Sequence, residues 1–225
     1  MARTRLEDGI AELHDGVRLL YSRADKAITD SMDALQRRDL AVARGVVEGD
    51  ATINAERYAI EEKVIDLMAR QAPVASDLRE MVSMLSIVTE LERIADHAEG
   101  IARIALFLKD NPIASEEPAL WEMKDKAQGM LRLALTSFVE KDEARARAAC
   151  DLDDEVDELY TVINQRLVQR LASVVAHDAG EFDAVTHVIW CSHNLERIGD
   201  RATNIAERAI FLVTGKLTEI NVSSY

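Results

Sequence analysis

The chain contains one twelve-residue sequence in two copies, and this repeat restricts the possible folds more than any other feature. Residues 91–102 read LERIADHAEGIA, and residues 195–206, which lie 104 positions later, read LERIGDRATNIA. A segment repeated at a fixed distance is typical of a duplicated supersecondary unit. The apolar residues in each copy are spaced three and four apart, as on the buried face of a helix: Leu91, Ile94, Ala98 and Ile101, then Leu195, Ile198, Ala202 and Ile205. We therefore expect two equivalent helices in two equivalent halves.

The repeat also retains charged residues that a helix core does not need. The charges kept in both copies are Glu92, Arg93 and Asp96, which recur as Glu196, Arg197 and Asp200. On a helix of 3.6 residues per turn these positions point roughly 100° or more away from the apolar stripe. Packing alone would preserve the stripe but not the charges. The two copies are therefore expected to share a function as well as a core.

The rest of the sequence indicates an all-α protein. The 225 residues include only nine glycines and three prolines, and aromatic residues make up 4%. Such a composition favours helices over strands. Helical periodicity predicts six long helices, over residues 5–38, 40–70, 76–109, 119–140, 142–175 and 181–216. At the start of the third, Asp77 and Glu80 have the spacing of a capping box.

A second duplicated stretch indicates how the helices are grouped. At an offset of 103, Asp39, Ala41, Ala43, Arg44 and Asp50 recur as Asp142, Ala144, Ala146, Arg147 and Asp153. Successive helices joined by short connections pack antiparallel, so each half is predicted to be a three-helix bundle. The turn-rich segment DNPIASEEP (110–118) separates the halves. We expect two tandem antiparallel three-helix bundles, at 1–111 and 117–216.

Each half carries two pairs of oxygen-bearing residues that could converge on a metal ion. The pairs are Asp50 with Asn54, Glu92 with Asp96, Asp153 with Asp157, and Glu196 with Asp200. Residues at i and i+4 share a helix face, where like charges destabilise a bare helix. Two antiparallel helices could bring three or four oxygens to one point, and such ligands suit hard cations rather than a structural zinc site. The sequence therefore predicts a divalent or ferric ion (Mg, Mn, Fe, Zn or Ca) in each half.

Two simpler roles for the acids stay open. Charged residues on the outer face of a helix are commonly just solvated, and Arg93 and Arg197 could neutralise their neighbours in place of a metal. Exposed ion pairs contribute only ~0–1 kcal/mol, so stability is a weak reason to keep them twice. His97 and His193 border the acid rows and are weaker candidates for the same sites.

Charge and motif content narrow the possible functions. A net charge of −14 argues against nucleic acid as a partner, and no run approaches the length of a membrane span. Cys150 and Cys191 have no metal or redox spacing, as expected of reduced thiols in a cytoplasmic protein. The sequence contains no phosphate loop, nucleophile elbow or HExxH motif, and no nucleophile–base pair. We expect a non-enzyme.

On these residues the chain resembles the PhoU family of phosphate-uptake regulators of bacteria and archaea. The resemblance covers nearly the whole chain and rests on VVEGDATIN (46–54), APVASDLR (72–79), LERIADHA (91–98), CDLDDEVDELY (150–160) and, most specifically, LERIGDRATNIAE (195–207). It implies two three-helix bundles, often dimeric, with metal at the acid-x-x-x-acid motifs. It also implies a link between the Pst phosphate importer, with its ATPase, and a sensor histidine kinase, which holds the phosphate-starvation response off when phosphate is plentiful.

Carried over by position, the implied metal ligands are Asp50, Asn54, Glu92, Asp96, Asp153, Asp157, Glu196 and Asp200. Asn54 departs from the acid expected there, and an amide oxygen ligates more weakly than a carboxylate. We therefore expect tighter binding in the second half. The competing interpretation is a helical protein with a metal storage or enzymatic role. A metal storage protein would need many sites, and an enzyme would need an enclosed pocket. The acids of this chain are instead expected to face outward.

Overall fold

The computed structural model describes residues 2–173 and 179–220, and the all-α fold predicted from the sequence is confirmed there. Its elements are α1 (Ala2–Arg37), α2 (Leu40–Gln71), α3 (Ala75–Leu108), the 3₁₀ turn η1 (Ile113–Glu116), α4 (Ala119–Glu140), α5 (Glu143–Asp151), α6 (Asp153–Ser173) and α7 (Ala179–Thr214). No helix among the described residues combines the length and apolarity needed to cross a membrane.

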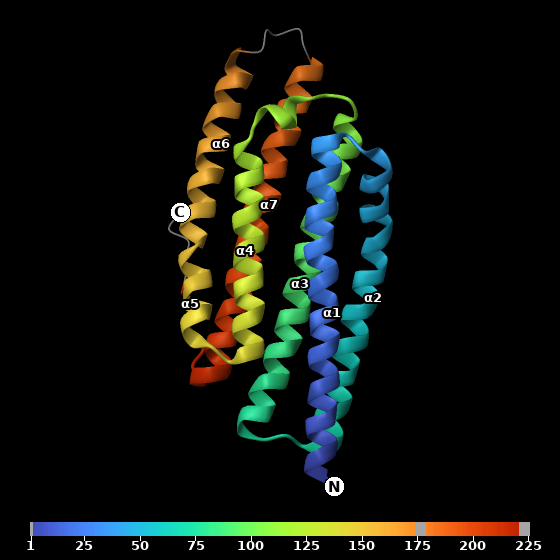
Figure 1. Cartoon of the computed structure of the whole chain (residues 1–225), viewed down its shortest axis with the longest axis vertical. Coiled ribbons are helices and arrows are strands. Elements are labelled where there is room, and N and C mark those ends of the chain that lie inside the picture. Colours follow the sequence, from blue (N-terminus) through green and yellow to red (C-terminus); the bar gives the residue numbers. More distant parts are fainter. Residues whose placement is uncertain (1, 174–178, 221–225) are drawn as a thin grey trace.

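The helices form two antiparallel bundles that lie side by side along the long axis of the molecule (Figure 1). In the first half α1, α2 and α3 pack against one another, and in the second half α4 packs against α5, α6 and α7. The two halves meet mainly where α3 packs against α7. The bundle bounds predicted at 1–111 and 117–216 stay a prediction.

The duplicated residues have matching structural roles in the two halves. Asp39 caps α2, because its carboxylate accepts bonds from the backbone N–H groups of Ala41 and Val42 at 3.0 and 3.1 Å. Asp142 caps α5 by accepting from the N–H of Arg145 at 3.0 Å. Aspartate suits this position because its side chain satisfies N–H groups that the first helical turn leaves unpaired. The repeated apolar stripes are fully buried, as predicted: Leu91, Ile94, Ala98, Ile101, Leu195, Ile198, Ala202 and Ile205.

The single helix predicted over 142–175 is wrong, because the chain breaks at Leu152 into α5 and α6. The break gives α6 its own N-terminus, and the acids Asp153, Asp154 and Glu155 occupy its first turn. Negative charges are favourable there because unpaired N–H groups give a helix N-terminus partial positive charge. In an unbroken helix the same three carboxylates would only repel one another. The last two residues of the predicted helix lie outside the described residues.

The capping box predicted at Asp77 and Glu80 is also wrong. The residue before α3 is Val74, whose side chain makes no capping hydrogen bond. Glu80 instead lies buried between the halves, with Oε1 2.8 Å from His14 Nε2 of α1 and Oε2 accepting from Lys141 Nζ at 2.9 Å. Lys141 belongs to the turn between α4 and α5, so Glu80 joins the two bundles. Burial alone would raise the pKa of Glu80, but the bonds from His14 and Lys141 outweigh it and lower the pKa.

The seam between α3 and α7 has approximate two-fold symmetry. His97 Nδ1 lies 3.1 Å from Asn194 Oδ1. The 104-residue offset exchanges this pair for Arg201 and Glu90, which also meet, with 3.4 Å between Arg201 Nη1 and Glu90 Oε2. Reciprocal pairs of this kind define an isologous interface, in which two copies of one surface face each other. The halves are therefore related by rotation about the seam.

Candidate metal centres and their surroundings

In the first half the structure brings three of the predicted acids together between α2 and α3. Asp50 lies on α2, and Glu92 and Asp96 lie on successive turns of α3. Burial, followed by the negative charges of Glu92 and Asp50, raises the pKa of Asp96 to about 6. A hydrogen bond with Asp50 contributes to the same rise. We call Asp50, Glu92 and Asp96 the first acidic cluster.

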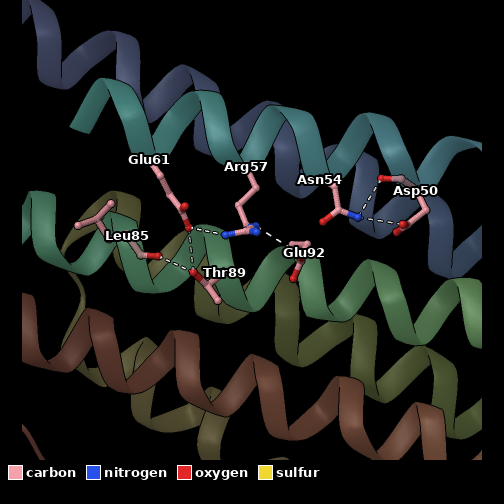
Figure 2. A network of polar contacts seen from close by, with 7 residues as sticks. All are labelled: Asp50, Asn54, Arg57, Glu61, Leu85, Thr89 and Glu92. Carbon is pink, nitrogen blue, oxygen red and sulfur yellow. Dashed lines mark hydrogen bonds and ion pairs between the residues drawn. The ribbon is translucent and has the colours of Figure 1, made fainter. Parts of the chain in front are cut away.

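Asn54 lies beside this cluster and acts as a hydrogen-bond donor. Its Nδ2 donates to Asp50 Oδ2 at 2.9 Å and more weakly to the Asp50 backbone carbonyl at 3.4 Å (Figure 2). The amide therefore orients one oxygen of Asp50. The other oxygen, Oδ1, is buried without a hydrogen-bond partner among the described residues.

In the second half all four predicted acids come together between α6 and α7. We call Asp153, Asp157, Glu196 and Asp200 the second acidic cluster. Burial and the charge of Asp200 raise the pKa of Glu196 to about 7, against the opposing effect of Arg197. Burial and the charges of Asp153 and Asp200 likewise raise the pKa of Asp157 to about 6. Raised pKa values on several neighbouring acids indicate that these side chains are partly desolvated and that their negative charges repel one another.

The arginines considered as neutralising partners behave differently in the two halves. Arg197 does neutralise a cluster acid, since its Nη1 lies 2.5 Å from Asp200 Oδ2. Arg93, at the equivalent position, faces away from the first cluster and lies 3.7 Å from Glu90. A cation that does contact the first cluster is Arg57 of α2, whose Nε is 3.4 Å from Glu92 Oε1. Comparing the repeats could not identify Arg57, because its equivalent in the second half is Tyr160.

The two candidate histidines, His97 and His193, lie in different surroundings. His193 borders the second cluster, with Nδ1 3.3 Å from Glu196 Oε2. His97 is directed into the seam toward Asn194, away from the acids. Burial lowers the pKa of His97, which favours its neutral form. Of the two, His193 is therefore the one placed to assist a cluster.

The second cluster contains buried carboxylate oxygens, the kind of donor that a hard cation prefers. Asp153 and Glu196 are only 7% and 8% exposed, and Glu196 Oε2 is buried without a hydrogen-bond partner in the described part of the chain. Buried carboxylates without enough donors are costly unless a cation compensates them. Within the residues that the structure describes, no group of three or more histidine, cysteine, aspartate or glutamate side chains already encloses a point where an ion could sit. Ion binding would therefore require these side chains to turn toward one another.

The second cluster borders a hollow in the surface of the molecule, and another hollow adjoins that one. A hollow of about 430 Å³ is lined by Asp153, Asp200 and residues 217–219. A second, of about 590 Å³, is lined by Glu61, Thr89 and Arg93. The two hollows share the α7 residues Asn204, Glu207 and Arg208. The two hollows are therefore parts of one continuous surface along α7.

Both cysteines are buried thiols, and Cys150 lies near Asp153 of the second cluster. Cys150 and Cys191 are buried and not disulfide-bonded. Burial raises the pKa of both thiols to about 12, so they stay protonated and unreactive near neutral pH.

The fold and the acidic clusters together define a class: duplicated helical-bundle proteins with one acidic, oxygen-rich site in each half. Comparison with known proteins identifies the family. The PhoU domain matches the chain twice, over residues 17–105 and 120–209. The chain belongs to the PhoU family, and the resemblance inferred from the sequence is confirmed.

The relatives match over almost their whole length. A phosphate-specific transport system accessory protein PhoU homolog of Clostridium acetobutylicum is 36% identical over 222 residues, which span 98% of this chain and 100% of the relative. Its counterpart in Caulobacter vibrioides is 35% identical over 92% of this chain and 89% of its own length.

Solved structures agree with the fold over a similar range. The crystal structure of PhoU from Pseudomonas aeruginosa aligns with a TM-score of 0.84 at 30% identity, covering 93% of this chain and 99% of that one. The phosphate transport system regulatory protein PhoU of Streptococcus pneumoniae gives a TM-score of 0.87 at 27% identity, covering 96% and 100%. The chain is thus a PhoU-family accessory protein of phosphate transport.

Proposed function

We propose that this protein is a cytoplasmic, non-enzymatic adaptor that represses the phosphate-starvation response in phosphate-rich cells. It would do so by contacting the Pst transporter ATPase and a sensor histidine kinase, acting as a homodimer. The observation that carries the proposal is the match, over 98% of the chain, to an accessory protein of phosphate-specific transport. A net charge of −14 supports contact with basic protein surfaces, because opposite charge speeds encounter.

Deletion of the gene tests the adaptor role. Phosphate-responsive genes should stay on in phosphate-rich medium in the deletion strain, and the parent gene should restore repression. Pull-down with the tagged protein should recover a Pst component or a sensor kinase. Normal repression in the deletion strain, with neither partner recovered, would contradict the proposal and favour the alternative of a metal-handling helical protein.

We further propose that both acidic clusters bind a divalent or ferric ion, the second more tightly than the first. The second cluster offers four carboxylates and the first offers three, with Asn54 committed to Asp50 as a donor. The charge of the ligand set is a main determinant of affinity for hard cations. A bound ion would supply the positive charge that either set of carboxylates lacks.

Metal titration of paired variants tests this proposal. Glu196→Gln/Asp200→Asn should remove the tighter site, and Glu92→Gln/Asp96→Asn only the weaker one. The repression assay then separates two roles for the metal. If the metal is sensory, Glu196→Gln/Asp200→Asn should lose repression while remaining folded. If the metal is structural, the main effect of the same variant should be a lower thermal stability. Identical titrations for the parent and both variants would refute metal binding at these acids.

A further inference from the structure

The two sides of the seam between α3 and α7 differ in their surface side chains. The 104-residue offset pairs Ser86 and Thr89 of α3 with Trp190 and His193 of α7. Two small hydroxyl residues of the first half thus correspond to two ring-bearing residues of the second. The apolar stripe beneath them is buried in both halves. The repeats have therefore diverged in the shape of their surface while they keep the same core.

Trp190 belongs to a cluster of three rings from α3 and α7, Phe107, His187 and Trp190, which we call the aromatic knob. The rings of Phe107 and His187 are stacked with their centres 3.6 Å apart, and those of His187 and Trp190 meet at 64° with centres 4.9 Å apart. His187 Nδ1 donates to the backbone carbonyl of Asp183 at 2.7 Å, which orients the central ring. Phe107 and Trp190 are nevertheless 50% and 52% exposed. Exposed aromatic side chains held in fixed positions are typical anchors of protein interfaces.

At the position equivalent to Trp190, the first half has a hollow. It is the hollow of about 590 Å³ described above, and its lining comes from α2, α3 and α7: Glu61, Ile65, Ser86, Thr89, Asn204 and Arg208 are among its residues. This volume lies in the range of sites that hold drug-sized molecules, ~300–1,000 Å³. An indole ring is smaller than such molecules. The hollow can therefore hold a tryptophan side chain, and Ser86 is too small to fill it.

The internal symmetry places the knob and the hollow on one face of the molecule. The seam pairs described above show that α3 and α7 run antiparallel. An axis that exchanges two antiparallel neighbours is perpendicular to the plane of the pair, so each residue and its equivalent share a face. Ser86 and Trp190 therefore lie on the same face, at equal distances from the axis. A second two-fold axis lying in this face, at right angles to the line from Ser86 to Trp190, would place the Trp190 of each copy over the Ser86 of the other.

We infer that the homodimer forms through this face: the aromatic knob of each chain enters the hollow of the other, so that Trp190 fills the space above Ser86 twice per dimer. This inference rests on the proposed homodimer and deepens it by naming the surface. An isologous dimer requires a surface that is complementary to itself. A knob and a matching hollow at equal distances from one axis meet that requirement, which a surface shaped for an unrelated partner need not meet. The occupant is therefore a second copy of this chain.

Net charge acts against this association at long range. Each chain carries −14, so two copies repel each other, and salt screens the repulsion. The dimer should therefore tighten as the salt concentration rises. Contact with a basic protein should weaken under the same change, because salt also screens attraction. The salt dependence thus separates a second copy from a basic partner.

Sedimentation equilibrium of the full-length protein tests the inference. The parent should form a concentration-dependent dimer. Trp190→Ser removes the anchor, and Ser86→Trp fills each hollow with the chain's own indole. Each substitution should raise the dimer Kd about tenfold or more, as loss of a tryptophan anchor commonly does. Leu19→Ser is the matched control, because Leu19 of α1 is also 52% exposed but lines neither of the two hollows.

A mixture of the two variants gives a sharper test. Trp190→Ser keeps the hollow and lacks the anchor, whereas Ser86→Trp keeps Trp190 and lacks the hollow. Neither variant alone can seat a knob in a hollow, but a mixed pair can do so once. The equimolar mixture should therefore dimerise more tightly than either variant alone. Thermal unfolding of each variant shows whether lost association comes from lost folding, which the mixture could not reverse.

Fluorescence reports on Trp190 itself. The chain has two tryptophans, so Trp121→Phe leaves Trp190 as the single one. Its emission should shift to shorter wavelength as the protein concentration rises through the range in which the dimer forms, because the indole leaves water. A dimer that forms elsewhere would leave this emission unchanged.

The outcomes separate the inference from the proposed function. A parent dimer with the same Kd in Trp190→Ser and Ser86→Trp would overturn the inference and leave the homodimer, formed through another surface. A parent that stays monomeric at every concentration would overturn both. If that monomer lost its Pst or kinase partner in pull-downs when Trp190 was replaced by Ser, the face would bind a different protein, and the inference would be wrong.

Discussion

At the scale of single residues, the crowded acids make the stability of the metal-free protein depend on pH. The pKa values of Asp157 and Glu196 are raised to about 6 and about 7. The folded protein therefore binds more protons near neutral pH than the unfolded chain does, and stability must fall as pH rises through this window. We expect the parent in chelator to have a higher Tm at about pH 5.5 than at about pH 7.5, by several degrees, since ~1 kcal/mol corresponds to about 2–4 °C at this size.

The control for this prediction is Asp157→Asn/Glu196→Gln, which cannot ionise at the two positions. Its Tm should change less between the two pH values than that of the parent. His97 contributes in the opposite direction because its pKa is lowered, but it is present in both proteins and cancels in the comparison. Equal pH dependence in parent and variant would show that the acids do not repel one another.

The sequence predicted the acids of the candidate site and two of their neighbours, Arg197 and His193, but not Arg57. Glu92, Asp96, Glu196 and Asp200 stand out because packing does not explain why both copies keep them. Arg57 could not be found by the same comparison, since it is present in one copy only. The hydrogen bond from Asn54 to Asp50 could not be predicted either, because the sequence does not show which group the amide Nδ2 donates to.

At the scale of helices, Glu80 is expected to matter far more than its neighbour Asp77. Glu80→Ala removes a buried carboxylate that ties α3 to α1 and to the α4–α5 turn, and leaves His14 and Lys141 without their partner. We expect a loss of about 1–3 kcal/mol in the free energy of unfolding, the usual effect of leaving a buried polar group such as His14 without its partner. Urea denaturation at neutral pH measures it, with Asp77→Ala as the control.

A capping box would predict the reverse ranking or similar losses for Asp77→Ala and Glu80→Ala. The pH dependence gives a second check. Because the pKa of Glu80 is lowered by folding, its stabilisation is present above the unfolded value of about 4.5 and disappears as pH falls through the folded pKa. The difference between parent and Glu80→Ala should therefore shrink in acid.

Periodicity predicts helix boundaries well where it is long, and poorly where local chemistry competes with it. The predicted range 119–140 coincides with α4. The sequence does not predict the break at Leu152, because the apolar residues keep their helical spacing across it. The acids Asp153, Asp154 and Glu155 favour a new helix N-terminus there, but this preference is recognisable only when the position of the break is known. The spacing of Asp77 and Glu80 fits a capping box equally well whether or not Glu80 has a better partner on another helix.

At the scale of the whole molecule, the seam between α3 and α7 is expected to hold the halves together through its paired charges. Arg201→Glu would place two carboxylates opposite each other at Glu90 and should lower the free energy of unfolding by about 2 kcal/mol, as for other lost charged hydrogen bonds. Adding Glu90→Arg to the same chain should restore most of the loss. Arg93→Glu is the control, since Arg93 also faces Glu90 but is half exposed and should cost less.

Failure of the exchanged pair to recover stability would mean that Arg201 acts through other contacts than Glu90. Chemical denaturation of the parent and the three variants, each as the full chain, measures whether stability is recovered.

The seam itself could not be predicted from the sequence. His97 and Asn194 lie 97 positions apart and belong to different copies, so no local pattern connects them.

The two-fold symmetry of this seam indicates how a duplicated gene of this kind arises. Two identical chains that associate through one surface produce such an axis, and joining them end to end preserves it. In a pair of identical chains, any substitution appears at both sites at once. After fusion, His97 facing Asn194 and Arg201 facing Glu90 became free to evolve separately. The ancestral dimer could not have kept arginine in one half and tyrosine at the matching place in the other, and the fused chain does.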